Sequence, residues 1–181
     1  DVGLHSFQGG YYPHEFSGGM QQRVMIAIAL CCAPSLVIAD EPTTALDVTV
    51  EAQILDLIRE EQKKNGLSVI MITHDLGVVS EITDTVIIMY AGQIVEHAST
   101  AEIINNPKHP YTKGLLQSRP QIGQKDQLIP IEGVVPNLTN LPEGCYFAPR
   151  CSQAEDICYQ QSPPTFTLNS DQSVKCWLYN E

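Results

Sequence analysis

The stretch LVIADEPTTALD, residues 36–47, decides the class of fold. Four apolar residues followed by an acid predict a parallel strand that is covered on both faces and whose carboxyl end lies at a site. A helix is expected next, over about residues 48–64, because apolar side chains recur there at helical spacing. The run LSVIMIT, residues 67–73, predicts a second strand. This order of strand, helix and strand indicates an α/β fold.

The flanking segments complete the predicted architecture. Upstream, MQQRVMIAIALCC, residues 20–32, is apolar nearly all round and predicts a buried helix. Downstream, residues 85–98 predict a hairpin, and residues 99–118 predict two short helices. Residues 121–144 are rich in proline, glycine and polar side chains, so we expect an irregular connection there.

The composition predicts a soluble globular chain that does not seek phosphate backbones. It has 181 residues, 43% of them hydrophobic, which is enough for one sizeable core. The formal net charge is −11, so non-specific binding to nucleic acid or to anionic lipid is not expected. No apolar run approaches the roughly 20 residues that a bilayer-spanning helix needs.

Three short features carry candidate chemistry, and each also has a plainer explanation. The Ser-Gly-Gly sequence at 17–19 begins a helix, where free amides can bind phosphate, although such a turn is more often only a cap. Asp40 and Glu41 end a strand, where one carboxylate can serve a magnesium ion and the other a water molecule. A solvated acid pair is the alternative. His74, at the end of the next strand, is either a donor to a γ-phosphate oxygen or a structural histidine.

Taken together, these features resemble the ABC-type ATPases. The sequences SGGMQQR, LVIADEPTTALD and MITHD are similar to the signature motif, the Walker B motif with its D-loop, and the switch histidine of that family. The similarity covers about residues 13–97. The resemblance implies that Asp40 holds Mg²⁺ through water, that Glu41 is the general base, and that His74 contacts the γ-phosphate of ATP.

The same resemblance implies a dimer with ATP at its interface. In such ATPases the signature of one subunit faces the nucleotide held by the other, and residues 45–47 would form the D-loop that contacts the partner. The residues that the resemblance assigns to the nucleotide site, besides those named above, are Ser17, Gly18, Gly19, Gln21 and Asp47.

The phosphate loop of that family, G-x-x-x-x-G-K-[ST], has no match in these residues, because no Gly-Lys is followed by Ser or Thr. We therefore expect the C-terminal part of a longer subunit, which would not hydrolyse ATP alone. The predicted fold is a partial ABC-type P-loop ATPase domain with a mainly parallel sheet and a C-terminal hairpin. Residues 1–98 would form this part, and residues 99–181 a small irregular extension that contains cysteines.

The segment NNPKHPYTKGLLQSRP, residues 105–120, resembles the C-terminal extension of oligopeptide, dipeptide and nickel importer ATPases. The resemblance implies an ATPase at the cytoplasmic face of the membrane that works with a second ATPase subunit, two permease subunits and an extracytoplasmic binding protein. Peptide is favoured over nickel as cargo. A soluble ABC-type ATPase that acts on nucleic acid or ribosomes is an alternative that the acidic charge disfavours. An inactive remnant is a third interpretation.

Six cysteines form two groups that need separate explanations. Cys31 and Cys32 end an apolar helix, and we expect them to be buried and structural. The other four read C-x5-C-x6-C-x17-C, without the short knuckle that is usual for structural zinc, and their wide spacing favours an iron–sulfur cluster. Zinc, disulfides and free thiols remain alternatives. The importer resemblance implies a structural [4Fe-4S] cluster held by Cys145, Cys151, Cys158 and Cys176.

Overall fold

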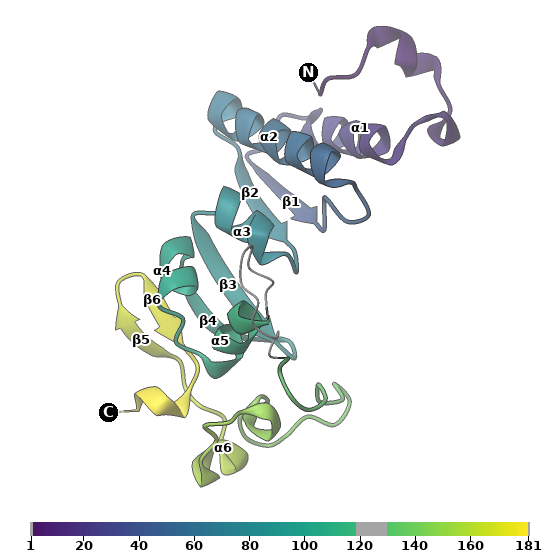
Figure 1. Ribbon diagram of the computed structural model, residues 1–181. Helices are drawn as coiled ribbons and strands as arrows, with labels where there is room; N and C mark the ends of the chain where they lie inside the picture. Colours follow the sequence, from purple (N-terminus) through teal and green to yellow (C-terminus); the bar gives the residue numbers. More distant parts are fainter. Residues whose placement is uncertain (1, 119–129, 181) are drawn as a thin grey trace. The chain divides into compact units, whose positions relative to one another are not determined.

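A computed structural model describes residues 2–118 and 130–180. Contacts between Cα atoms divide the chain into two compact units, Asp1–Val78 and Val79–Glu181 (Figure 1). None of the helices in the described ranges combines the length and the continuous apolar character that a bilayer-spanning helix requires.

The first unit is built on two parallel strands, and its α/β character confirms the predicted fold class. β1 pairs with β2 in register, from Leu36 with Ser68 to Asp40 with Ile72, so that the carboxyl ends of both strands coincide. The elements of this unit are η1 (Ser6–Gly10), η2 (Pro13–Glu15), α1 (Gly18–Leu30), β1 (Leu36–Asp40), α2 (Val48–Asn65), β2 (Ser68–Ile72) and the start of α3 (Leu76–Ile82).

Helix α2 supplies most of the buried side chains of this unit. Asp47 caps its first turn, because Asp47 Oδ1 accepts a hydrogen bond of 3.0 Å from Val50 N. Gly66 ends it with φ of 63°, a backbone conformation that glycine adopts without strain. The predicted helical spacing is confirmed, since the buried side chains of α2 are Ile54, Leu55, Leu57, Ile58 and Glu61.

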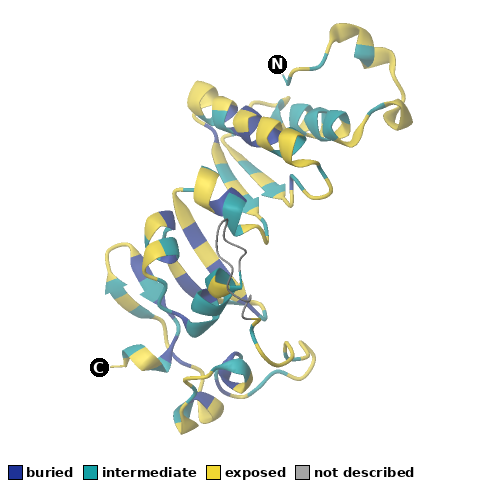
Figure 2. Ribbon diagram, viewed as in Figure 1, coloured by how far each residue is buried: buried dark blue, intermediate teal, exposed yellow. Residues whose placement is uncertain are grey.

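Two predictions of burial in this unit are wrong. The strands are covered on one face only, where α2 lies, and the apolar residues of the opposite face, such as Ile38 and Ile70, are exposed (Figure 2). Helix α1 contains no buried residue, and Met25 and Ile28 are more than half exposed. An apolar sequence predicts burial only where another element of the fold covers it.

The second unit is a four-stranded antiparallel sheet with strand order β3-β4-β6-β5. The predicted hairpin is confirmed as β3 (Thr85–Tyr90) and β4 (Gln93–Ser99). The remaining elements are α4 (Thr100–Asn105), α5 (Pro110–Gln117), η3 (Ala148–Arg150), α6 (Asp156–Gln160), β5 (Phe166–Asn169), β6 (Gln172–Val174) and η4 (Trp177–Tyr179). The core is formed by Val79, Val86, Ile88, Tyr90, Val95, Ala98, Ile103 and Phe147.

Strands β5 and β6 were not expected from the sequence, and they join the hairpin directly. β4 pairs with β6, so that Glu96 lies opposite Val174. The proposed division of the sequence at 98/99 therefore separates two strands that are neighbours in space, whereas the compact units divide between Val78 and Val79. The predicted irregular connection falls partly on residues 119–129, outside the described residues, and residues 130–144 contain no helix or strand.

Candidate functional site

Glu41 and His74 meet at the coincident ends of β1 and β2. Glu41 follows β1 directly, and its backbone N–H donates to the carbonyl of Ile72 at 2.8 Å. His74 lies two residues beyond the end of β2. The Nδ1 atom of His74 is 3.1 Å from Oε1 of Glu41. The parallel register of the two strands thus brings together two side chains that the sequence predicted to share a site.

Hydrogen bonds to the side chain of Glu41 favour its charged form. Thr44 Oγ1 donates to Glu41 Oε2 at 2.9 Å. This hydrogen bond, and after it the one with His74, lowers the pKa of Glu41. The Glu41 side chain is 46% exposed and that of His74 is 79% exposed, so both can be reached by a substrate. Glu41 has φ of 45°, which holds the turn after β1 in a left-handed conformation that is uncommon for a residue with a side chain.

The contact with Glu41 also constrains the protons of His74. A ring nitrogen that faces a carboxylate carries the proton, so Nδ1 is the donor here. In the neutral ring, Nε2 then has a free lone pair and accepts rather than donates. Donation to a phosphate oxygen therefore requires the imidazolium form or a turn of the ring away from Glu41.

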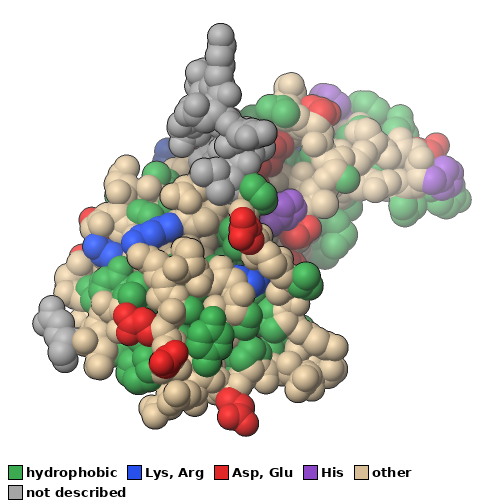
Figure 3. Space-filling model, turned by 60° about the horizontal axis from the view of Figure 1, so that its bottom comes forward, with side chains coloured by type: hydrophobic (Ala, Val, Ile, Leu, Met, Phe, Trp, Pro, Cys, Tyr) green, Lys and Arg blue, Asp and Glu red, His purple; other side chains and the backbone are tan. Residues whose placement is uncertain are grey.

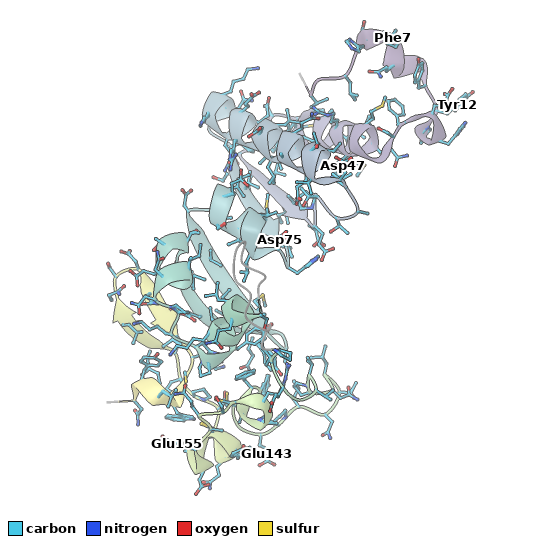
Figure 4. The ribbon with its side chains drawn as sticks, in the orientation of Figure 1. Phe7, Tyr12, Asp47, Asp75, Glu143 and Glu155 are labelled. Atoms are coloured by element: carbon cyan, nitrogen blue, oxygen red, sulfur yellow. The ribbon has the colours of Figure 1, made fainter. Side chains whose placement is uncertain are left out.

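Two other predicted carboxylates lie near this edge of the first unit. Asp40 is the last residue of β1 and is exposed. Asp47 is occupied as the cap of α2. Asp75 likewise caps α3, because its Oδ1 accepts a hydrogen bond of 2.6 Å from Gly77 N in the first turn of that helix. Figure 4 shows Asp47 and Asp75 beside the helices whose first turns they complete.

The predicted signature residues lie at the start of α1. Ser17 caps the helix, with Oγ accepting from Met20 N at 3.4 Å. Gln21 has its side-chain amide directed back along the chain, where Nε2 donates to the carbonyl of Pro13 at 2.9 Å and to that of Phe16 at 3.4 Å. Gln21 therefore fixes the segment that leads into the helix.

The two glycines at this helix start differ in what surrounds them. A Cβ atom at Gly19 would collide with Cγ1 of Val50, so Gly19 lets α1 approach α2 within this chain. A Cβ atom at Gly18 would lie 3.6 Å from Leu46 Cδ2, which is ordinary contact. The close packing of α1 on α2 therefore explains why residue 19 is a glycine. Packing does not explain the glycine at position 18, where a methyl group would fit.

Within residues 2–118 and 130–180, no hydrogen bond or ion pair joins Ser17, Gly18 or Gln21 to Glu41 or His74. The predicted site residues thus fall into two groups in the first unit. One lies at the ends of the strands, and the other lies at the start of α1.

The prediction for the first pair of cysteines is wrong. Cys31 and Cys32 are both exposed, and their sulfurs are 3.7 Å apart. They follow the last turn of α1, which is exposed on much of its surface. Both this prediction and that of a buried α1 took an apolar sequence as a sign of burial.

The other four cysteines converge on one cavity in the second unit. The cavity has a volume of about 20 Å³. Figure 3 brings the side of Figure 1 that carries α6 towards the viewer, and hydrophobic side chains gather there among polar ones. No three or more His, Cys, Asp or Glu side chains of the described ranges are arranged to hold a metal ion, so the predicted cluster has no direct support. The cysteines that line the cavity are Cys145, Cys151, Cys158 and Cys176.

The environment of these thiols disfavours their charged form. Burial raises the pKa of the thiols of Cys145 and Cys151, and it raises that of Cys176 to about 11. The neighbouring sulfurs raise these values further, because like charges repel. Backbone N–H groups act in the opposite direction, as Gln153 N does by donating to Cys151 Sγ at 3.4 Å. A cation in the cavity would have to displace these protons.

Some residues of these sites were not recognised from the sequence. Thr44 follows the acid pair in the sequence EPTT, and a hydroxyl three residues after a candidate base is a signal that can be read. Glu96 and His109 are each only 1% exposed, and nothing in their local sequence shows this. An acid that directly follows two apolar residues inside a strand, as in QIVEHA, is the sign that the sequence offers for Glu96.

Comparison with known proteins identifies the class. The family described as ABC transporter matches residues 2–44, and the Oligopeptide/dipeptide transporter, C-terminal region, matches residues 95–158. Through these separate matches the chain is similar to the ABC transporter ATP-binding family. Within that family it is related to the proteins of oligopeptide and dipeptide transport.

Three curated relatives show how far this relationship extends. The oligopeptide transport ATP-binding protein AppD of Bacillus subtilis is 56% identical over 94% of this chain and 52% of its own length. The oligopeptide transport ATP-binding protein OppD of Haemophilus influenzae is 53% identical over 95% of this chain and 53% of its own length. The dipeptide transport ATP-binding protein DppD of B. subtilis is 50% identical over 94% of this chain and 51% of its own length. The chain thus spans about half the length of these relatives.

Among solved structures, the ATP-binding cassette MJ0796, in a dimeric post-hydrolysis state with ADP and Pi, aligns with 55% of this chain and 42% of its own. The sequence identity is 31% and the TM-score is 0.49.

Proposed function

We propose that the complete subunit binds and hydrolyses MgATP and couples hydrolysis to the uptake of peptides across a membrane. The observation that carries the proposal is the 3.1 Å contact of Glu41 with His74 at the coincident ends of two parallel strands. The relatives named for oligopeptide and dipeptide transport support peptide as the cargo.

Glu41 would act as the general base. Its carboxylate is exposed, and the Thr44 hydroxyl favours the charged form, so that it can take a proton from an attacking water molecule. Asp40 precedes it at the end of β1, where it would hold Mg²⁺ through water. When bound, Mg²⁺ neutralises charge that develops on the phosphates.

When ATP binds, His74 would give up its hydrogen bond with Glu41 and donate one to the γ-phosphate instead. In its present position Nδ1 is used by the carboxylate, and the neutral ring has no second donor. A turn of the exposed ring, or protonation at Nε2, would supply the donor to a phosphate oxygen. Release of His74 would also free Oε1 of Glu41 to accept a proton from water.

The start of α1 would serve a second subunit. Ser17, Gly18, Gly19 and Gln21 make no polar contact with Glu41 or His74, which is consistent with the two groups serving different nucleotides. A dimer, with itself or with a related ATPase, follows from this arrangement, and Asp47 would lie in the contact between subunits. Residues 1–98 would belong to the ATPase domain and residues 99–181 to an importer-type extension.

The assembly would lie at the cytoplasmic face of a membrane. Two permease subunits would carry the peptide, and an extracytoplasmic binding protein would deliver it. These partners are proposed from the relationship to the peptide-transport proteins.

The test uses the full-length subunit assembled with its permeases in vesicles. Glu41→Gln should lower the rate of ATP hydrolysis by about 10²- to 10⁴-fold, as expected for loss of a general base, and leave ATP binding intact. Glu60→Gln, at an exposed position of α2, is the matched control. Hydrolysis by Glu41→Gln at the rate of the control would reject the assignment. Hydrolysis that is unaffected by peptide and its binding protein would reject the importer.

We further propose that the four-cysteine cavity holds a structural [4Fe-4S] cluster, with zinc as the alternative. Four thiols line one cavity, and three of them, Cys145, Cys151 and Cys176, interact with backbone N–H groups, which is the donor chemistry that either group requires. The residues that would hold it are Cys145, Cys151, Cys158 and Cys176. Such a group would tie together the segments around η3, α6 and η4.

Subunit purified under anaerobic conditions should contain iron and acid-labile sulfide in proportion to the chain. Stoichiometric zinc in place of iron would replace the cluster by a zinc site. Protein without either metal would leave the four residues as thiols.

A further inference from the structure

The wall of the four-cysteine cavity contains one imidazole. His109 lines it together with the four thiols, and the neighbouring wall includes the apolar side chains of Pro110, Phe147 and Leu178. In apolar surroundings of this kind a single hydrogen bond to a charged sulfur is stronger than in water. The position of one donor therefore matters for the whole site.

The structure holds His109 firmly. Its side chain is 1% exposed, and its ring packs against Phe147 with 5.7 Å between the ring centroids. The buried carboxylate of Glu96 fixes the backbone at this point, because it accepts a hydrogen bond of 2.7 Å from Lys108 N and one of 2.9 Å from His109 N. The start of α5 is thus attached to β4, and His109 has little freedom to turn.

One edge of the His109 ring is already used. Nδ1 accepts a hydrogen bond of 3.1 Å from Tyr111 N, where His109 caps α5. A nitrogen that faces an N–H donor carries no proton, so the proton of the neutral ring is on Nε2. Burial, and after it the charge of Lys113, lowers the pKa of His109 to about 4, which keeps the ring neutral. Among the described residues Nε2 has no hydrogen-bond partner.

We infer that His109 serves the four-cysteine cavity as a hydrogen-bond donor, through Nε2–H, to a deprotonated cysteine sulfur, and that it is not a metal ligand. Ligation through Nε2 would move the ring proton to Nδ1, where it would meet the N–H of Tyr111. Ligation through Nδ1 would break the cap of α5. Donation from Nε2 keeps both the tautomer of the ring and the cap of α5. The inference rests on the four-thiol site proposed above, and it is independent of ATP hydrolysis.

The role follows from the lining of the cavity. Besides the thiols and His109 the wall of the cavity is largely apolar, so a thiolate there has little stabilisation other than that from backbone N–H groups. A donor that faces a thiolate restores part of it, and partners of this kind contribute strongly to metal affinity. His109 is therefore a positioning residue that favours the sulfur state able to bind a metal.

Two substitutions separate the two edges of the ring. In His109→Asn, the short amide can still accept from Tyr111 N as a helix cap, but it does not reach the cavity. In His109→Gln, the longer side chain can present an N–H to the cavity, but it loses the cap. The pair thus separates the donor from the local fold.

The experiment measures Cd²⁺ binding to the full-length subunit, prepared free of metal under anaerobic conditions, by competition with a chelator. His109→Asn should weaken Cd²⁺ binding by about 10- to 100-fold, which is typical for loss of a residue that supports the metal ligands, with little change in melting temperature. His109→Gln should bind Cd²⁺ more tightly than His109→Asn and melt at a lower temperature. The ¹¹³Cd resonance of the wild type should be that of a four-sulfur site, and it should stay in that range in His109→Asn.

Several results would overturn the inference. They are wild-type affinity in His109→Asn, binding in His109→Gln that is no tighter than in His109→Asn, a ¹¹³Cd resonance that indicates a nitrogen ligand, and a wild type whose four thiols bind no Cd²⁺. A wild type that binds Cd²⁺ through four sulfurs but contains no iron or sulfide would reject the cluster alone and leave the role of His109 intact.

Discussion

The Nδ1 atom of His74 lies 3.1 Å from Oε1 of Glu41, although 33 positions separate the two residues in the chain. The contact exists because β1 and β2 run parallel in register, so both side chains emerge at the same edge. The proposed base and the proposed phosphate donor are therefore hydrogen-bonded to each other.

Removal of the Thr44 hydroxyl should change the pH dependence of hydrolysis. The hydroxyl lowers the pKa of Glu41, so Thr44→Val should raise that pKa. Because the base must be unprotonated, the acid limb of the kcat profile should move to higher pH, while activity well above the limb changes less. Thr43→Val is the control. A profile of Thr44→Val that coincides with that of the control would show that Thr44 does not tune the base.

The two glycines of the signature sequence should respond differently to alanine. Gly19→Ala places a methyl group against Val50, and we expect a loss of about 1–3 kcal/mol in the free energy of unfolding. Gly18→Ala has room, so its effect on stability should stay within about 0.5 kcal/mol. Urea denaturation measures both.

Val50→Ala should partly rescue Gly19→Ala, because it removes the atom that collides. ATP hydrolysis by the assembled dimer then tests Gly18 itself. A stable but inactive Gly18→Ala protein would place this glycine at nucleotide, whereas equal destabilisation by both alanines would contradict the packing explanation.

Neutralisation of Glu96 should destabilise the second unit. Glu96 is buried and accepts from Lys108 N and His109 N. Glu96→Gln presents an amide NH₂ to one of these donors, which leaves a buried group unpaired and should cost about 1–3 kcal/mol. Fluorescence of Trp177 during urea denaturation reports on this unit. Glu132→Gln, at an exposed position, should have no comparable effect.

His109 should make the metal-free protein less stable in acid. In the unfolded chain a histidine binds a proton near pH 6.5, whereas burial lowers the pKa of His109 to about 4 in the fold. Between these values the unfolded state holds more protons, so the stabilisation is complete above about pH 6.5 and is lost as the pH falls towards 4, by about 3 kcal/mol. The charged and titratable groups around the ring are Lys113, the carboxylate of Glu96 and the four thiols.

Urea denaturation at a series of pH values checks this expectation. His109→Asn should flatten the dependence across that window. His14→Asn, which changes an exposed histidine, should leave it unchanged. An equally steep dependence in His109→Asn would assign the acid sensitivity to other groups.

The architecture of the first unit could be predicted because its information is local. An apolar run that ends in an acid, a helix with regular spacing and a second apolar run suffice to place Asp40, Glu41 and His74 at one edge. The hydrogen bond from Thr44 escaped notice because it depends on the left-handed turn at Glu41, which no residue type announces.

Other properties could not be predicted, since they depend on pairs of distant residues. Pairing of β4 with β6 joins segments that share no local pattern. The exposure of Met25 and Cys31 depends on what covers α1, and apolar composition does not specify that. The burial of His109 depends likewise on Glu96 and Phe147, which lie far from it in sequence.

The sheet order of the second unit has a consequence for how the protein is made. A ribosome completes the β3–β4 hairpin long before it reaches β6, whose Gln172 contacts Glu96 across 76 positions of the chain. During that interval the edge of β4 has no neighbour, and an open edge can pair with a strand of another nascent chain. Closing so long a loop is also slow. Translation that stalls in the cysteine-bearing segment should therefore leave an aggregation-prone intermediate, in which the hairpin is formed and its closing strand is still absent.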